Sequence, residues 1–273
     1  MPFCQHDDWC SISEDGAICH CMRTESDWPC RSPKIGGWFH RLTEPVQYVA
    51  PPKPKVKPLR TEDFGPLADE CRKYMTPDKL EWLAADLGLS VTALDVLYVG
   101  WHAKYLVYAF PMYDPRRKPI GMQLRARDGK KWSVPGSAGG LFWPAGIDPK
   151  TCDTLLLPEG ASSCGACYDL GYDCIGRFNC EARADMVAEV VKQCRRTALV
   201  VIVADHDKDH FRKDGTIYHP GMDGAAKIAE VVKPLHRRLK IVKPPHQKDA
   251  REWLRAGATR VIVDEVIRNT DFV

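Results

Sequence analysis

The sequence predicts a multi-domain α/β protein with a cysteine-rich head, a small α+β subdomain and a domain built on a mostly parallel sheet. Two apolar runs, residues 154–158 and 198–204, are separated by helix-like segments, and each is followed by acidic residues. Continuous aliphatic runs of this kind are typical of parallel strands buried on both faces. Before them, residues 98–143 alternate in strand fashion, and residues 1–42 hold five cysteines.

Composition narrows the class of protein. The 273 residues are 44% hydrophobic and 27% charged, with a net charge of +3, which is ordinary for a soluble protein of about two globular units. The sequence contains no run of 18 apolar residues, so we expect no membrane span. The start of the chain, residues 1–6, has neither a basic segment nor an apolar core, so we expect a cytoplasmic protein. In a reducing compartment the twelve cysteines favour metal ligation or burial over disulfides.

The head, residues 1–42, has almost no aliphatic residues among its cysteines and cannot build a core of its own. A structural zinc ion would supply the missing folding free energy, roughly 10 kcal/mol or more. The spacing is irregular, because Met1 stands where a zinc ribbon would place the first cysteine of a pair. Reduced cysteines in a disordered tail are the alternative. The predicted ligands are Cys4, Cys10, Cys19 and Cys21, with His6, His20 and Cys30 as substitutes.

The next two segments are a linker and a small helical bundle. Residues 43–60 contain five prolines and repeated lysines, which predict an extended spacer. Residues 64–98 then show helical spacing. Thr76 and Pro77 are an N-cap and a first-turn proline, and Gly88 ends that helix before Ser90 starts another.

Residues 98–143 predict an antiparallel β unit with polar turns. The expected strands are residues 104–112, 120–127, 130–134 and 141–143. Along the second of these, polar and apolar residues alternate, so Arg125 and Arg127 share one face. Together with Lys130 and Lys131, this face can track phosphates. A merely solvated face whose charge discourages sheet aggregation is the alternative.

The second half of the chain alternates strands and helices, which indicates a three-layer α/β domain. Gly171 is expected to stop its first helix, and a polar loop is expected at residues 208–221. The expected order is strand 154–158, helix 161–170, strand 172–176, helix 182–193, strand 198–204, a helix from 224, strand 239–242 and a helical region from 248.

Acidic residues follow two of these predicted strands. Glu159 comes after the first run, and Asp205 and Asp207 come after the second. Ligand sites of open α/β sheets lie beyond the carboxyl ends of the strands, so these carboxylates should meet there. They repel one another unless a cation lies between them, and oxygen ligands suit Mg²⁺ or Mn²⁺. Helix caps or surface carboxylates are the alternative.

Four segments together resemble the Toprim domain shared by bacterial and phage-type primases, type IA and II topoisomerases and some nucleases. They are strand-Glu159-Gly160, strand-Asp205-x-Asp207, the Gly224-Ala225-Ala226 helix and Lys248-Asp249-Ala250.

The segment before this domain resembles the N-terminal subdomain of a primase RNA-polymerase core. The head occupies the place of the primase zinc-binding domain, so the resemblance covers nearly the whole chain in the family's order. The motifs are Phe110-Pro111-Met112-Tyr113-Asp114, Ile120-Gly121, Arg125, Lys131-Trp132 and Gly136-Ser137-x-x-Gly140-Leu141-Phe142.

The resemblance implies a zinc-binding head at residues 1–42, a linker at 43–60, the first part of the primase core at 61–150 and a Toprim-like catalytic domain at 151–273. It implies a DNA replication protein of a phage or mobile element. Two features depart from the family's pattern: the loop between Asp207 and Gly224 is long, and the zinc knuckle lacks a first cysteine. The chain has no Walker A sequence, so a replicative helicase would be a separate partner.

The implied activity is synthesis of short RNA primers from ribonucleoside triphosphates on a single-stranded DNA template. Asp205 and Asp207 would hold Mg²⁺ or Mn²⁺, Glu159 would complete the cluster or deprotonate the 3′-hydroxyl, and Asp249 would be an additional acid. A Toprim-type nuclease and a non-catalytic DNA-binding replication module are the alternatives. The implied nucleic-acid and nucleotide contacts are Arg125, Arg127, Lys130 and Lys131 for the template, and Arg177 and Lys248 for phosphates.

Overall fold

The chain divides into two compact units, Met1–Pro58 and Leu59–Val273. The computed structural model describes residues 3–6, 10–13, 15–32, 35–42, 63–179, 183–211 and 215–273. The predicted linker, residues 43–60, lies outside these ranges. Among the described residues, no helix is long and apolar enough to cross a membrane.

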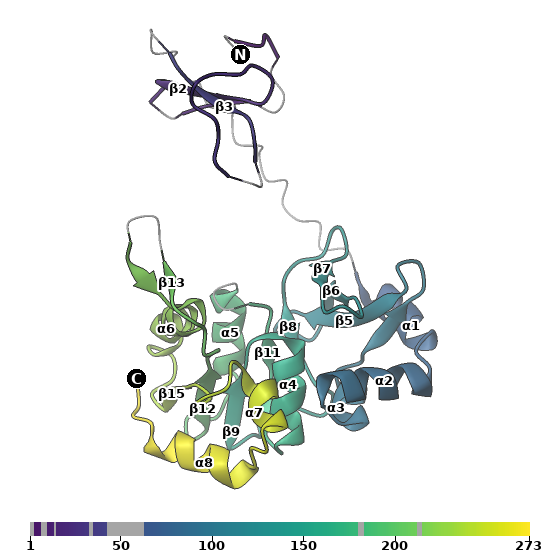
Figure 1. Ribbon diagram of the computed structural model, residues 1–273. Coiled ribbons are helices and arrows are strands. Elements are labelled where there is room, and N and C mark those ends of the chain that lie inside the picture. The colour runs from purple at the N-terminus through teal and green to yellow at the C-terminus, as the bar shows by residue number, and fades with distance from the viewer. Residues whose placement is uncertain are drawn as a thin grey trace. The chain divides into compact units, whose positions relative to one another are not determined.

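The smaller unit is built on a three-stranded antiparallel sheet, β1 (Ser11–Ile12), β2 (Ile18–Cys21) and β3 (Trp38–Arg41), shown in Figure 1. The turn between β1 and β2 contains Gly16 at φ 69°. In β2, Cys19 and Cys21 are both fully buried. Because side chains alternate along a strand, these two cysteines share one face of β2. The predicted cysteine-rich head is confirmed.

The larger unit begins with three helices, α1 (Gly65–Lys73), α2 (Pro77–Leu87) and α3 (Val91–Val96). The hydroxyl of Thr76 accepts a hydrogen bond from the backbone N–H of Lys79, and Gly88 ends α2 in the left-handed conformation. Ser90 caps α3 by accepting from the N–H of Ala93. The predicted helical bundle and both of its caps are therefore confirmed.

An antiparallel sheet follows, with strand order β11-β8-β5-β6-β7 and with β4 paired to β5. Its strands are β4 (Gly100–His102), β5 (Val107–Tyr113), β6 (Pro119–Arg125), β7 (Lys131–Ser133), β8 (Leu141–Phe142) and β11 (Gly176–Arg177). The expected strand at 104–112 starts only at Val107, because the chain turns between β4 and β5 with Leu106 at φ 55°. Both faces of β6 are covered. Met122 and Leu124 are buried on one face, and Gln123 on the other face is only 8% exposed.

The second sheet is wholly parallel, with strand order β10-β9-β12-β15. Its strands are β9 (Thr154–Leu157), β10 (Asp173–Cys174), β12 (Leu199–Val203) and β15 (Leu239–Val242). Leu156 and Val201 pack into one hydrophobic cluster, whereas Leu155 and Val200 pack into another. The two faces of this sheet are therefore both buried, as the aliphatic runs predict.

Helices cover both faces of the parallel sheet (Figure 1). The helices α4 (Gly160–Asp169), α7 (Ala250–Arg255) and α8 (Arg260–Asn269) share one hydrophobic cluster, and α5 (Ala184–Val191) and α6 (Pro220–Val232) share the other. The predicted three-layer α/β arrangement is confirmed. Between β12 and α6, the expected polar loop contains a small hairpin, β13 (His210–Phe211) and β14 (Ile217–Tyr218). The helix α6 begins at Pro220 and not at residue 224, since proline is favourable in the first turn.

The two sheets are joined within the larger unit. Strand β11 comes from the second half of the chain but pairs with β8 of the antiparallel sheet. Phe110 and Phe142 of that sheet also lie in the same hydrophobic cluster as Leu156 of the parallel sheet. The domain boundary at residue 150 stays a prediction, because the residues on its two sides share one core.

Candidate functional site

The predicted acids lie at the carboxyl edge of the parallel sheet. Strands β9 and β12 are neighbours and end at Leu157 and Val203, and Glu159 and Asp205 each follow two residues later. Parallel strands direct both acids to the same edge. The carboxylate of Asp207 accepts a 2.6 Å hydrogen bond from the backbone N–H of Gly221, at the start of α6.

The electrostatics of this edge show how close the carboxylates lie. Burial, together with the charges of Glu159, Asp249 and Asp207, raises the pKa of Asp205 to about 7. Burial also raises the pKa of Glu159, while the charge of Arg177 opposes that rise. A raised pKa in both acids indicates that the positive charge around them is too small to stabilise their ionised forms. A bound cation would supply that charge.

The acid set fits a divalent cation held partly by water. Carboxylate oxygens are the donors that Mg²⁺ and Mn²⁺ prefer, and Mg²⁺ keeps several waters when one or two carboxylates bind it. In the described part of the chain, the acids do not form a group with all ligand atoms within 4.8 Å of one another; only a cysteine group does so. The edge therefore has the composition of a magnesium site, with an open arrangement of ligands.

Gly221 is a site residue that no predicted motif included. A Cβ atom at this position would lie 2.5 Å from the backbone oxygen of Asp205, so only glycine lets α6 approach the strand end this closely. The same residue donates its N–H to Asp207. A proline followed by glycine after a polar loop was the available signal, since Pro220 starts the helix.

Arg177 lies beneath the acids and has no exposed surface. Its Nε donates to the carbonyl of Leu157 and its Nη2 to the carbonyl of Val203, each at 3.0 Å. These carbonyls belong to the last residues of β9 and β12, and Arg177 also forms a β-bridge with Glu159. This buried position does not fit the implied contact of Arg177 with a triphosphate. Arg177 joins the two acid-bearing strand ends instead.

Basic side chains of the antiparallel sheet reach the same edge. Arg125 and Lys131 lie directly opposite each other on β6 and β7, and Arg125 contacts Asp86 at 3.6 Å. Lys131 keeps an exposed side chain, but the protein around it lowers its pKa by desolvation, and so do the charges of Arg125 and Arg251, whereas the acids Asp249 and Asp205 oppose this. The effects of Asp249 and Asp205 place Lys131 beside the acids. Arg251 is a further basic residue near Lys131 that belongs to none of the predicted motifs.

Asp249 is both a helix cap and a neighbour of the acids. Its carboxylate caps α7 by accepting a 2.8 Å hydrogen bond from the N–H of Glu252, and its charge also reaches Asp205. Next to it, Lys248 is exposed and reaches Glu159 electrostatically. The structure therefore brings both residues to the acidic edge, and their roles stay predictions.

Two predicted contacts lie elsewhere on the antiparallel sheet. Arg127 is exposed, with its guanidinium 5.0 Å from the ring centre of Trp82 and 5.9 Å from that of Trp101. Lys130 is exposed in the turn between β6 and β7, where its N–H donates to Asp128. Both side chains are accessible to a nucleic acid. Within the described residues, neither contacts the acids.

A pocket of about 810 Å³ opens beside Asp207. Its walls carry both signs of charge and several imidazoles, which suit a polar or phosphorylated ligand. It is lined by His206, Asp207, Lys208, Asp209, His210, His246, Lys248 and Glu252. His206 is held in this wall, because its Nδ1 lies 3.1 Å from the carbonyl oxygen of Pro244.

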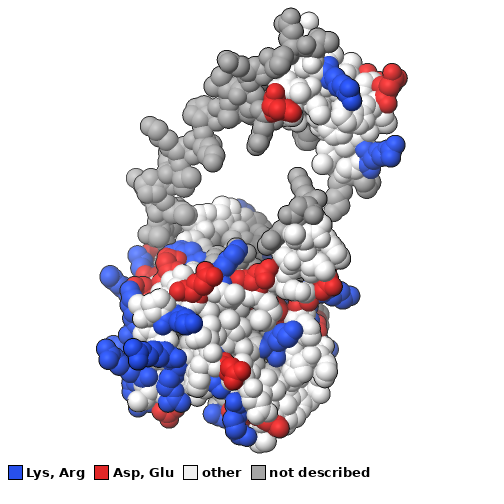
Figure 2. Space-filling model, turned by 90° about the vertical axis from the view of Figure 1, so that its left-hand side faces the viewer, with Lys and Arg blue, Asp and Glu red and all other residues white. Residues whose placement is uncertain are grey.

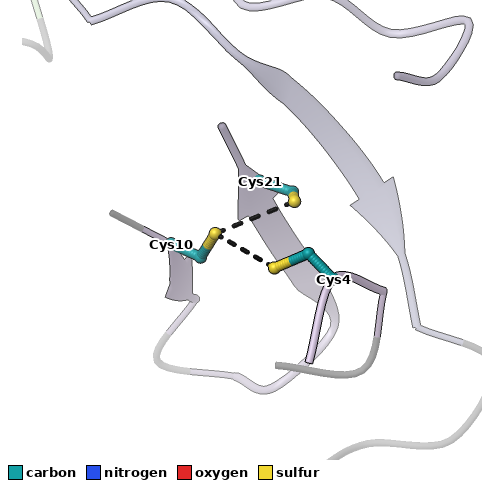
Figure 3. A group of neighbouring side chains, drawn as sticks. All are labelled: Cys4, Cys10 and Cys21. Carbon is teal, nitrogen blue, oxygen red and sulfur yellow. Dashed lines mark hydrogen bonds between the residues drawn. The ribbon is translucent and has the colours of Figure 1, made fainter. Parts of the chain in front are cut away.

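Three of the predicted zinc ligands converge in the head (Figure 3). The Sγ atom of Cys10 lies 3.5 Å from that of Cys4 and 3.7 Å from that of Cys21. A tetrahedral zinc ion with Zn–S distances of about 2.3 Å separates its sulfurs by roughly 3.8 Å, so this spacing fits zinc. Cys4 lies in a turn, Cys10 directly precedes β1 and Cys21 is the last residue of β2, so the thiols come from separate segments and are irregularly spaced in sequence.

Hydrogen bonds prepare Cys21 to bind metal as a thiolate. Burial acts to raise its pKa, but the backbone N–H groups of Arg23 and Thr24 donate to the sulfur and lower that pKa to about 6. Cys19 lies outside the group of three, although the charges of Cys21, Cys10 and Cys4 reach it. Of the substitutes, His20 directs its Nε2 toward the carbonyl of Gly36 at 2.7 Å.

Comparison with known proteins rests on structure. No protein-family profile matches the sequence, and no curated protein matches it. The Escherichia coli primase catalytic core is similar, with a TM-score of 0.56 and 14% identity over 78% of this chain and 80% of that one. A DnaG primase catalytic domain bound to single-stranded DNA has a TM-score of 0.58 and 14% identity, with 78% of each chain covered.

The similarity extends to a primase solved with its zinc-binding domain. The Aquifex aeolicus primase, comprising zinc-binding and RNA-polymerase domains, has a TM-score of 0.58 and 13% identity, over 76% of this chain and 60% of that one. The predicted resemblance is confirmed at the level of the fold. The chain therefore has the fold of the catalytic cores of bacterial and phage primases.

Proposed function

We propose that this protein is a DNA primase that joins ribonucleoside triphosphates into short RNA primers on a single-stranded DNA template. The observation that supports the proposal is that Lys131, paired with Arg125 across β6 and β7, reaches Glu159 and Asp205 electrostatically within the fold of a primase catalytic core. Acids alone would suit hydrolysis as well as synthesis. The similarity of the fold to primase catalytic cores favours synthesis.

Asp205 and Asp207 would hold Mg²⁺ or Mn²⁺, with Asp249 as a further acid at the same edge. The bound ion would neutralise triphosphate charge and orient the attacking and leaving oxygens. Glu159 accepts the proton of the primer 3′-hydroxyl, a role that suits a carboxylate whose pKa burial has raised. Lys248, exposed on the pocket wall, meets a triphosphate oxygen.

The template lies along the antiparallel sheet in this proposal. Arg125 and Lys131 contact its phosphates closest to the acids, and Arg127 and Lys130 extend the track. Arg177 acts as a positioning residue and touches no substrate, because it is fully buried.

The head would be a structural zinc module that helps to select where priming starts. Cys4, Cys10 and Cys21 supply three thiolates for the ion, and Cys19, on the same face of β2 as Cys21, supplies the fourth. Zinc supplies the folding free energy that this small sheet cannot obtain from its core.

One assay separates the three classes of function. The protein is incubated with single-stranded DNA, the four ribonucleoside triphosphates and Mg²⁺ or Mn²⁺, with the label on the nucleotides in one reaction and on the DNA in another. Labelled oligoribonucleotides support primer synthesis. Shortened DNA would indicate a nuclease, and binding without either product would indicate a non-catalytic module. A replicative helicase on a separate chain is the expected partner.

A further inference from the structure

Four strands of the antiparallel sheet place one row of side chains on a single face. Trp101 pairs with Tyr108, Tyr108 pairs with Arg125, and Arg125 pairs with Lys131. Directly opposite residues on neighbouring strands lie on the same side of a sheet. The row therefore runs from Trp101 on β4 to Lys131 on β7, and the charge of Asp205 reaches Lys131.

The helix α2 adds side chains to the same face. Its residues Lys79, Trp82 and Asp86 recur at helical spacing along one side of the helix. Asp86 contacts Arg125 at 3.6 Å, and the ring of Trp82 lies nearly parallel to that of Tyr108, with 6.1 Å between the ring centres. This side of α2 therefore lies along the row.

Arg127 lies over the aromatic part of this face. Its guanidinium carbon is 5.0 Å from the ring centre of Trp82 and 5.9 Å from that of Trp101. The rings of Trp101 and Tyr108 meet edge to face, with 5.1 Å between their centres. Arg127 is exposed, whereas Tyr108 is fully buried and Trp82 is 43% exposed. We call Trp82, Trp101 and Tyr108 the aromatic support of Arg127.

The acids near the aromatic support leave the charge of Arg127 available. Within the described residues, Asp86 pairs with Arg125, and no carboxylate forms an ion pair with Arg127. The carboxylate of Asp128 accepts a backbone N–H in its own turn. Lys79 brings a second cation, because its ammonium lies 5.0 Å from the centre of the β4 indole. The acids of α2 and of this turn are Asp78, Glu81, Asp86 and Asp128.

We propose that the aromatic support positions Arg127 to bind a phosphate of the single-stranded template. The two indoles take the face of the guanidinium, so its N–H groups, which lie in the plane, stay free to donate to two phosphate oxygens. An arginine that is ordered in advance loses less side-chain entropy when it binds. Trp82 is the positioning residue, since its ring is the nearer of the two. This inference rests on the proposed function, because primer synthesis requires a template strand.

The position of the row selects this ligand. One end of the row, Lys131, lies beside the acids at which the primer would be made. The other end, Trp101, is three strand spacings away, or about 14 Å. A template strand that leaves the acids along the row therefore brings its backbone to Arg127.

The overall charge of the molecule makes single cations important for this binding. The net charge is only +3, and in the view of Figure 2 lysines and arginines are interspersed with acids. Affinity for a nucleic acid rises with the number of phosphates that basic side chains neutralise. With so little excess positive charge, that number depends on how well individual arginines and lysines are positioned.

The test is a double-variant cycle of binding to an unstructured, labelled single-stranded DNA oligonucleotide, using the full chain with Mg²⁺ and without nucleotides. Trp82→Leu removes the aromatic face but keeps an apolar, helix-forming side chain. It should weaken binding about threefold to tenfold, and Trp82→Phe should restore most of the affinity. When Arg127→Gln is already present, Trp82→Leu should have no further effect.

Salt dependence separates positioning of an arginine from stacking on a base. Arg127→Gln should reduce the slope of log affinity against log salt by about one. Trp82→Leu removes no charge, yet it should also reduce this slope, because an unsupported arginine neutralises the phosphate less completely. Urea denaturation of each variant verifies that it is folded.

Tyr98→Leu is the matched control. The ring of Tyr98 also lies under a guanidinium, that of Arg72 at 5.6 Å, but Arg72 already pairs with Asp95. Because this arginine is neutralised within the protein, the control should leave both the affinity and the salt slope unchanged.

Equal affinity of Trp82→Leu and the unaltered chain would overturn the inference. An effect of Trp82→Leu that adds to that of Arg127→Gln would also contradict it, since Trp82 would then contact the DNA itself. No DNA binding by the unaltered chain would contradict it as well. Binding that depends on Trp82 through Arg127, without any primer synthesis, would overturn the proposed function alone.

Discussion

At the scale of single residues, Arg177 shows why the acids can gather at one edge. Its guanidinium is fully buried, donates to the last carbonyls of β9 and β12, and opposes the rise in the pKa values of Glu159 and Asp205. The sequence marked it only as an arginine after a short strand. Its burial follows from tertiary packing between the two sheets, which no local pattern encodes.

Replacing Arg177 should therefore damage the fold as well as the site. Arg177→Met should lower the free energy of unfolding by about 3–5 kcal/mol, because buried carbonyls and acids lose their partner. Urea denaturation measures this change. Arg195→Met is the matched control: Arg195 is half exposed and pairs with the 97% exposed Asp153, so its loss should cost under about 1 kcal/mol. Similar losses for the two variants would contradict the assigned role of Arg177.

Asp205 links the site to pH. Burial and the charges of the neighbouring acids raise the pKa of this carboxyl from its ordinary 3.8 to about 7, so the folded chain holds a proton that the unfolded chain releases. Its contribution to the free energy of unfolding is therefore complete below about pH 4 and is lost as the pH rises through 7. A three-unit shift sets an upper limit of about 4 kcal/mol, and partial exposure reduces the expected loss to about 1–2 kcal/mol.

Asp205→Asn should remove this loss. Without metal, the free energy of unfolding of the unaltered chain should fall by about 1–2 kcal/mol between pH 5 and pH 8 through this carboxyl. The variant should not show this fall. Added Mg²⁺ or Mn²⁺ should stabilise the unaltered chain at pH 8 but not the variant. Thermal denaturation with and without the cation checks both effects, with the exposed Asp271→Asn as the control. Equal cation-induced stabilisation of Asp205→Asn would rule out a metal site on this carboxylate.

At the scale of elements, the start of α6 fixes the relation between helix and strand. The small residues from Gly224 onward predict this helix, but the helix begins at Pro220. The difference matters because it places the N–H of Gly221 on Asp207. Periodicity identified the helix itself, whereas the position of its first turn depends on packing against Asp205.

Gly221→Ala tests that packing. The added Cβ would meet the backbone oxygen of Asp205 at 2.5 Å, so α6 or the strand end must move. We expect a loss of about 1–3 kcal/mol in the free energy of unfolding and a larger, at least tenfold, loss of primer yield. Ala226→Gly, an exposed position in the same helix, is the control for helix propensity and should cost about 1 kcal/mol without a selective loss of yield.

Other elements show where local patterns succeed and where they fail. The caps at Thr76 and Ser90 were predictable, since their side chains bond the nearby backbone. The turn before β5 was not, because Leu106 adopts a positive φ that is unusual for leucine. The β13–β14 hairpin was also missed, since its strands are only two residues long and lie in a polar segment.

At the scale of the whole molecule, the chain consists of a cysteine-rich unit and a larger α/β unit. The parallel sheet, its helices and the three acids at its edge could be predicted from aliphatic runs that end in acids. The join between the two sheets could not, because β11 pairs with β8 across more than thirty intervening residues. The convergence of Cys4, Cys10 and Cys21 was predicted in part, since irregular spacing left the fourth ligand open.

The two units should respond differently to removal of metal. Elemental analysis of the purified protein should find about one zinc ion per chain, and a strong chelator should unfold the head while leaving the unfolding transition of residues 59–273 in place. Cys21→Ser should lose zinc, whereas Cys71→Ser, a buried cysteine of α1, should keep it. Zinc-free protein with an intact head would contradict the metal site.

The central claim is that the acids at the edge of the parallel sheet make RNA primers. Mass spectrometry of reactions containing single-stranded DNA, ribonucleoside triphosphates and Mg²⁺ or Mn²⁺ tests it most directly. The unaltered chain and Asp271→Asn should yield oligoribonucleotides that begin with a 5′-triphosphate, and Asp205→Asn and Asp207→Asn should yield none. Undiminished oligoribonucleotides from both site variants, or fragments of the DNA in place of new RNA, would contradict the claim.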